Sequence, residues 1–143
     1  MRLLDTNILS ELVRKRPDPH VIEQLFSQKH GSLFSSEYTR YELRRGACLR
    51  PDNGRLWSRL EAMVIPIVEW LPITQPISLR AAELAADLQR KGQGIGTADI
   101  FLAATALAHQ LVLVTRNTRH FCRVPGLSLE NWFGDDRAEP DPF

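Results

Sequence analysis

Short apolar runs alternate along the chain with longer segments in which apolar residues recur every three or four positions. The short runs predict strands and the longer segments predict helices, because side chains on one face repeat every two residues in a strand and about every 3.6 in a helix. Strands are expected at residues 2–5, 32–36 and 111–115, with two further pieces at 67–69 and 71–73 on either side of Trp70. Helices are expected at residues 6–15, 19–29, 37–49, 78–91 and 97–109, with another that carries Leu56, Leu60, Met63 and Val64 on one face.

Several boundaries between these elements follow from local chemistry. Asp18 can cap the helix that starts at Pro19, a residue suited to the first helical position because its ring fixes the backbone angle. The Arg-Pro-Asp sequence at residues 50–52 interrupts the helical pattern. Residues 92–96 are rich in glycine and predict a loop, and Thr97 is expected to cap the apolar helix that follows.

The alternation of strands and helices predicts an α/β fold, a three-layer α/β/α sandwich with a central, mostly parallel sheet. The predicted strands are apolar throughout, as expected of strands that helices cover on both faces. By this pattern, residues 1–134 form a single domain without internal repeats. The remaining residues 135–143, DDRAEPDPF, are acidic and contain two prolines, which predicts a disordered tail.

The composition is that of a globular protein and speaks against a membrane or secreted one. Of the 143 residues, 43% are hydrophobic and 24% are charged, and no window holds the roughly 18 apolar residues that a membrane span needs. Asp5 and Glu11 fall where a signal peptide would be apolar. Cys48 and Cys122 have neither metal-binding nor disulfide spacing, so a cytoplasmic location is expected.

The net charge of +1 hides an asymmetry between the body of the chain and its end. Residues 135–143 hold four acids and one arginine, which leaves 17 basic and 13 acidic residues, a net charge of +4, in residues 1–134. Arginine outnumbers lysine 15 to 3. Because the guanidinium group suits phosphate oxygens, the body of the domain is compatible with a polyanionic partner.

Three acidic residues are expected near one edge of the sheet, beyond the carboxyl ends of the strands, where such folds bind ligands. Asp5 ends the first predicted strand, Asp99 begins the apolar helix, and Glu42 lies on the helix after the second strand. Each has an ordinary alternative role: Asp5 and Asp99 can cap helices, and Glu42 can form a surface ion pair with Arg45. If the three carboxylates meet, their repulsion calls for a cation, and hard oxygen ligands favour Mg²⁺ or Mn²⁺.

Four segments carry a family resemblance. They read LLDTNILSE, YELRRG, GTADIFLAATALAHQLVLVT and TRNTRHFCRVPGLSLENW, and they occur in this order between residue 1 and about residue 133. Together they resemble the PIN-domain ribonucleases, specifically the VapC-type toxins of bacterial toxin–antitoxin pairs. The resemblance implies that Asp5, Glu42 and Asp99 are the catalytic, metal-binding acids, with Thr6 and Thr115 as supporting polar groups.

One position departs from the pattern of the family. Many relatives carry a further acid after the last core strand, where this chain has Asn117. Asn117 is the fourth predicted catalytic residue. An amide oxygen can bind a metal ion but brings no negative charge, so a second ion would bind more weakly here. We expect one resident ion, with any second ion recruited by the phosphate of bound RNA.

The implied activity is the hydrolysis of an RNA phosphodiester bond by a water molecule, which leaves a 5′-phosphate and a 3′-hydroxyl. Asp5 and Asp99 would hold the metal ion, and Glu42 would orient the ion or the water. Transfer RNA is the substrate class expected from the family. Three residues beside the pocket could bind the RNA backbone, or could equally belong to a solvated turn: Arg116, Arg119 and His120.

The resemblance also implies partners. These are a VapB-type antitoxin, a second copy of the chain in a homodimer, and operator DNA that is reached only through the antitoxin. The antitoxin would insert its C-terminal segment into an apolar groove. The candidate groove residues, most of which also suit the core, lie between 21 and 64: Leu25, Phe26, Leu56, Trp57, Leu60 and Met63.

Other functions fit the sequence less well. The main alternative is a PIN-type subunit that acts chiefly as a binding module in an antitoxin–operator complex, with little nuclease activity. RNA cleavage by paired histidines is disfavoured, because the four histidines show no acid–base arrangement. A phosphoacceptor receiver domain would need a lysine after the last strand, and the three lysines lie elsewhere, at Lys15, Lys29 and Lys91.

Overall fold

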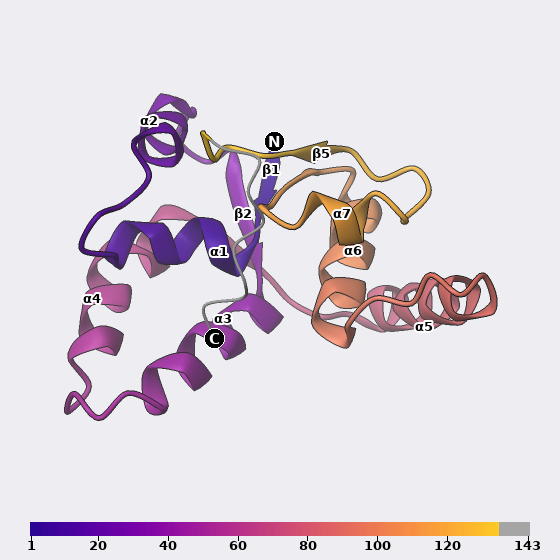
Figure 1. Cartoon of the computed structure of the whole chain (residues 1–143), viewed down its shortest axis with the longest axis horizontal. Helices are drawn as coiled ribbons and strands as arrows, with labels where there is room; N and C mark the ends of the chain where they lie inside the picture. Colours follow the sequence, from indigo (N-terminus) through magenta and orange to yellow (C-terminus); the bar gives the residue numbers. More distant parts are fainter. Residues whose placement is uncertain (135–143) are drawn as a thin grey trace.

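Five parallel strands form one sheet in the computed structural model, which describes residues 1–134. The strands follow the order β3-β2-β1-β4-β5, so that β1 lies at the centre. Figure 1 shows β1 beside its neighbour β2. All four pairings between neighbouring strands are parallel, and the predicted α/β/α sandwich is confirmed. The strands are β1 (Arg2–Leu4), β2 (Leu33–Ser36), β3 (Glu69–Leu71), β4 (Val112–Val114) and β5 (Leu129–Glu130).

Helices cover both faces of the sheet and bury two separate cores. One face packs against the first half of the chain, with the helices α1 (Thr6–Leu9), α2 (Pro19–Ser27), α3 (Glu37–Cys48) and α4 (Arg55–Met63) and the 3₁₀ turn η1 (Ser10–Val13). The other face packs against α5 (Gln75–Arg90), α6 (Thr97–His109) and α7 (Thr118–Phe121). A second 3₁₀ turn, η2 (Ile65–Ile67), leads from α4 to β3.

Adjacent residues of the central strands supply opposite cores. Leu4 and Val114 belong to the core under α1–α4, whereas Leu3 and Leu113 belong to the core under α5–α7. All four side chains are completely buried. Burial of a large apolar side chain stabilises a fold by about 1.5–3 kcal/mol, and here both faces of each strand contribute. This two-sided burial explains why β1 and β4 read as continuous apolar runs.

Side-chain caps determine where two helices begin. The carboxylate of Asp18 accepts hydrogen bonds from the backbone N–H groups of His20 and Val21, which confirms the predicted start of α2. Ser36 ends β2, and its hydroxyl oxygen accepts a hydrogen bond from the N–H of Tyr38. The chain therefore passes directly from β2 into α3.

Four predicted boundaries were wrong. The helix expected at residues 6–15 is α1 followed by the separate turn η1. The two strand pieces around Trp70 are one strand, β3, with Trp70 at its centre. Thr97 is the first helical residue of α6, because Gly96 occupies the N-cap position and makes no side-chain cap. The helix expected from residue 78 begins at Gln75, after Thr74 as its N-cap.

Two further expectations need correction. Met63 was placed on the buried face of its helix, but it is 44% exposed. Leu60 is the one buried residue of α4. The short helix α7 was not predicted, because a four-residue turn with one apolar residue, Phe121, is too short to show an apolar period.

Three other expectations concern the whole chain. No helix among the described residues is long and apolar enough to span a membrane. Cys48 and Cys122 are both exposed free thiols, as their spacing predicts. The predicted disordered tail at residues 135–143 lies outside the described residues.

Candidate active site

The candidate site lies where the strand order of the sheet changes direction, at the carboxyl ends of β1 and β4. The chain lays down β1, β2 and β3 on one side of the sheet and then returns to place β4 on the other side of β1. Ligands of parallel sheets bind at such a switch point, beyond the carboxyl ends of the two strands. Here Asp5 follows β1 and Thr115 follows β4. The two residues lie side by side, because Leu4 pairs with Val114 in register.

Asp5 is a buried carboxylate with a role in the local fold. It is the N-cap of α1, and its Oδ1 accepts a 2.6 Å hydrogen bond from the backbone N–H of Thr6. Only 7% of the residue is exposed. The capping role that the sequence left open is therefore real, and it coexists with the position of Asp5 at the strand end.

Thr115 and Asn7 orient the second carboxylate oxygen of Asp5. The hydroxyl of Thr115 donates a 2.8 Å hydrogen bond to Asp5 Oδ2, and the amide of Asn7 lies 3.4 Å from the same oxygen. Thr115 Oγ1 in turn accepts a hydrogen bond from the N–H of Asn117, at 3.0 Å. Asn7 Oδ1 accepts one from the N–H of Arg116, at 3.3 Å. Asp5 is thus clamped between the start of α1 and the turn after β4.

Glu42 and Asp99 approach Asp5 from two other helices. Glu42 lies on α3, and its Oε1 accepts a 3.0 Å hydrogen bond from the hydroxyl of Thr6. Asp99 lies in the first turn of α6, and its Oδ2 is 3.3 Å from Nδ1 of His120 on α7. Residues that are far apart in the sequence therefore gather around the N-terminus of α1.

The electrostatics of Asp5 reflect this gathering. The pKa of the Asp5 carboxyl is raised to about 7, mainly by burial and also by the negative charges of Asp99 and Glu42. The hydrogen bonds from Thr115 and from the Thr6 N–H oppose the rise, because they stabilise the charged form. A carboxylate in this field gains from a bound proton or a bound cation.

The donor set suits a hard divalent cation, but the three side chains do not form a closed cage. Within residues 1–134, no three acidic, histidine or cysteine side chains are grouped closely enough to hold a metal ion. Like charges separate when no cation lies between them. Asp5, Glu42 and Asp99 therefore fit Mg²⁺ or Mn²⁺ by their oxygen chemistry and shared field, and their side chains would have to move closer together to surround an ion.

The remaining predicted residues lie around the turn after β4. Asn117 is the N-cap of α7 and contacts the site through its backbone; within residues 1–134 its side chain makes no hydrogen bond. The Arg116 guanidinium stacks over the Phe133 ring, at 4.3 Å. Arg119 and His120 are exposed on α7. Asn7 was missed as a member of the site, although the Asp-Thr-Asn sequence could have indicated it.

Residues 2–127 match the sequence model of the PIN domain family. The chain belongs to the PIN-domain family. This match covers every residue of the candidate site, from Asp5 to His120.

Individual PIN-domain relatives narrow the group to the VapC-type ribonucleases. The chain is 37% identical over 136 residues to VapC ribonuclease Y4jK of Sinorhizobium fredii, which covers 92% of this chain and 96% of the relative. It is 31% identical over 130 residues to the tRNA(fMet)-specific endonuclease VapC of Shigella flexneri, which covers 91% and 96%. Among solved structures, VapBC2 from Rickettsia felis, bound to a DNA fragment from its promoter, superposes with a TM-score of 0.82 at 29% identity, covering 92% of this chain and 98% of that one.

Proposed function

We propose that this protein is a metal-dependent endoribonuclease toxin that hydrolyses RNA and is neutralised by a cognate antitoxin. One observation carries the proposal: Asp5 is buried, is clamped by Thr115 and Thr6, and has its pKa raised by burial together with Asp99 and Glu42. A structural cap has no need of two further acids in its field. A set of oxygen ligands that binds a cation does need several acids close to one another.

Each residue of the site has a distinct role in the proposed reaction. A bound Mg²⁺ or Mn²⁺ supplies charge neutralisation at the phosphate and a more acidic water. Asp5 and Asp99 would hold the ion through their carboxylate oxygens, and Glu42, oriented by the Thr6 hydroxyl, would position the ion or the water. The Thr115 hydroxyl fixes Asp5 Oδ2, so that this carboxylate needs little reorganisation.

The RNA backbone is proposed to bind at the turn after β4. One basic side chain of this turn lies beside the acids, since His120 contacts Asp99 directly. Transfer RNA is the proposed substrate class, in line with the printed specificity of the Shigella flexneri relative. The side chains proposed to contact the phosphates are Arg116, Arg119 and His120.

The proposed partners are an antitoxin of the VapB type, operator DNA bound through that antitoxin, and a second copy of the chain. The Rickettsia felis relative is a complex of this kind on promoter DNA. This relationship also favours the second candidate function, a binding module that acts in a repressor complex with little nuclease activity.

One experiment separates the two functions. The purified protein is incubated with transfer RNA in Mg²⁺, in Mn²⁺ and in chelator, next to Asp5→Asn, Asp99→Asn and the control Asp87→Asn on α5. We expect cleavage only with metal, a loss of about 100-fold or more in the two site variants, and wild-type cleavage in the control. Cleavage that persists unchanged in Asp5→Asn would point to a contaminating nuclease and favour the binding module. Thermal unfolding of each variant shows whether its fold is kept.

A further inference from the structure

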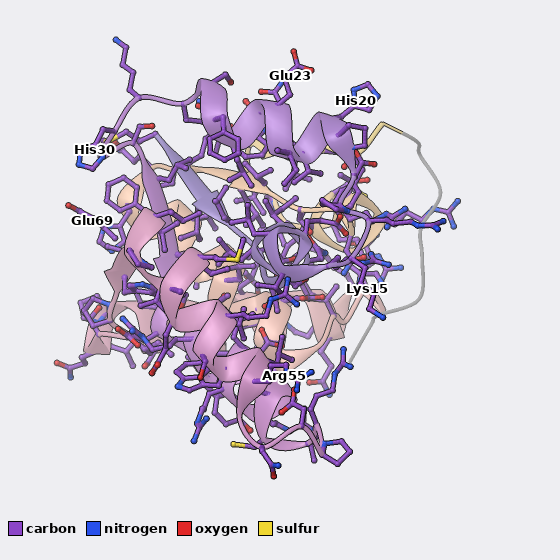
Figure 2. All side chains as sticks on the ribbon, turned by 90° about the vertical axis from the view of Figure 1, so that its left-hand side faces the viewer. Lys15, His20, Glu23, His30, Arg55 and Glu69 are labelled. Carbon is purple, nitrogen blue, oxygen red and sulfur yellow. The ribbon has the colours of Figure 1, made fainter. Side chains whose placement is uncertain are left out.

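A groove with an apolar floor and basic walls lies between η1, α3 and α4. Its volume is about 550 Å³, and its floor is apolar, formed in part by Leu43, Leu56 and Leu60. Five basic residues and one acidic residue line it. Figure 2 labels two of the basic side chains, Lys15 and Arg55, which reach this groove from different segments of the chain.

The positive charge of the groove is only partly balanced by neighbouring acids. Arg14 pairs with the buried Glu11, at 2.8 Å. The single acid of the lining, Asp52, accepts hydrogen bonds from backbone N–H groups at the start of α4. Within residues 1–134, no ion pair involves the other four basic residues of the lining, which are Lys15, Arg50, Arg55 and Arg59.

The described part of the chain ends close to this groove. The N–H of Gly134 lies 3.5 Å from Asp18 Oδ2. A Cβ at position 134 would overlap the His20 ring, so the glycine lies directly against the start of α2. Asp18 is only three residues from Lys15, a span of at most about 11 Å. Gly134, the last described residue, therefore lies at the same end of the molecule as the η1 wall of the groove.

The segment that follows Gly134 complements the groove in charge and in apolar character. Residues 135–143 carry Asp135, Asp136, Glu139 and Asp141 against the single Arg137, and they end in Pro142-Phe143. We propose that residues 135–143 of this chain bind the basic groove between η1, α3 and α4. The acids would face the arginines of α4, and the aromatic and proline side chains would cover the half-buried Leu56, since Leu43 and Leu60 are already buried beneath it.

Reach and linkage favour this occupant over others. Nine extended residues span at most about 30 Å, enough to follow the groove from η1 to α4. A directly linked segment acts at an effective concentration of about a millimolar, whereas a second copy of the chain must also lose free translation and rotation. The apolar floor suits proline and phenylalanine better than a phosphate backbone.

Such binding would affect more than the surface of α4. The groove and the candidate active site share two segments, because Leu43 follows Glu42 on α3 and Ser10 follows the α1 helix that Asp5 caps. The bound segment would compete with any acidic ligand of the groove. This inference is independent of the proposed nuclease activity and would hold for a pure binding module.

A zero-length carbodiimide cross-link on the intact chain tests the proposal, because it joins a lysine amine directly to a carboxylate. The only three lysines are Lys15 in the groove and the exposed Lys29 and Lys91 outside its lining. Peptide mapping of monomeric product should place the acids of 135–143 on Lys15 in about threefold or greater excess over the other two lysines. The yield should fall about threefold or more in 1 M salt, where the screening length is about 3 Å.

A cross-link to Lys15 could also form because Lys15 is close to Gly134, after which the segment begins, without binding of the segment to the groove. Charge reversal in the groove distinguishes these two explanations. Arg55→Glu with Arg59→Glu should lower the Lys15 yield as far as salt does, whereas the matched pair Arg80→Glu with Arg90→Glu on α5 should not. Equal yields on all three lysines, a Lys15 yield unaffected by both salt and the groove pair, or cross-links only between two chains would each overturn the proposal. The salt series uses the wild-type chain, so the test survives a variant that fails to fold.

Discussion

Asp5 has a strongly raised pKa, and the sign of its effect on stability can be worked out. Burial raises its pKa from 3.8 to about 7 in the folded protein. Between about pH 4 and pH 7 the folded protein therefore binds more protons at this position than the unfolded chain does. Stability must fall as pH rises through this window, and the full cost remains above pH 7.

Asp5→Asn removes this dependence, because an amide does not titrate. In chelator, we expect the free energy of unfolding of Asp5→Asn to gain on that of the wild type by about 2 kcal/mol between pH 5 and pH 8. Urea unfolding at both pH values measures the gain. Asp87→Asn should run parallel to the wild type, and a parallel course for Asp5→Asn would show that Asp5 is not the source of the pH effect.

At the scale of elements, the sequence predicted what local chemistry determines. The start of α2 follows from Asp18 and Pro19, and β1 and β4 follow from apolar runs that end at polar residues. β3 was split because it lies at the sheet edge and carries an exposed Glu69 next to a half-buried Trp70. The more apolar Ile65–Ile67 is a 3₁₀ turn instead. Edge strands are not buried on both faces, so their sequences lack the continuous apolar run by which a central strand is recognised.

The cap of α2 gives a prediction at this scale. Asp18→Ala removes two hydrogen-bond acceptors for the N–H groups of His20 and Val21. We expect a loss of about 1 kcal/mol in the free energy of unfolding, since caps of this type contribute about 0.5–2 kcal/mol. Asp18→Asn keeps an acceptor oxygen and should lose less than half of that amount. Urea unfolding of both variants decides, and equal losses would mean that the charge of Asp18 matters more than the cap.

The site itself exists only at the scale of the whole molecule. Asp5, Glu42 and Asp99 each had an ordinary local explanation, and Asp5 indeed caps α1. What no local pattern contains is the strand order, which sets β1 between β2 and β4 and so brings α3 and α6 to the same end. The family resemblance predicted that the three acids belong to one site, and the strand order explains why they lie at the same end of the sheet. The contribution of Asn7 depends on a turn 109 residues away and was missed for the same reason.

A divalent cation at the proposed site should therefore stabilise the whole fold, because the three distant acids are brought near one another only in the folded protein. With Mn²⁺ at about 100 times its dissociation constant, the expected gain is about 2.7 kcal/mol, which corresponds to several degrees in Tm for a chain of this size. The gain should be larger at pH 8 than at pH 6, since protonation of Asp5 competes with the ion below its pKa of about 7. Thermal unfolding with and without Mn²⁺ at both pH values measures it.

Variants at two positions make this last prediction specific to the site. Asp5→Asn should abolish the stabilisation by Mn²⁺, whereas Asp87→Asn should keep it. Asn117→Asp adds a carboxylate beside Thr115, whose hydroxyl already contacts both Asp5 and the N–H of residue 117. It should shift half-maximal stabilisation to a lower Mn²⁺ concentration if the Asn117 side chain can reach the ion. An unchanged concentration would remove Asn117 from the metal site, while a gain in Tm that persists in Asp5→Asn would place the ion elsewhere on the protein.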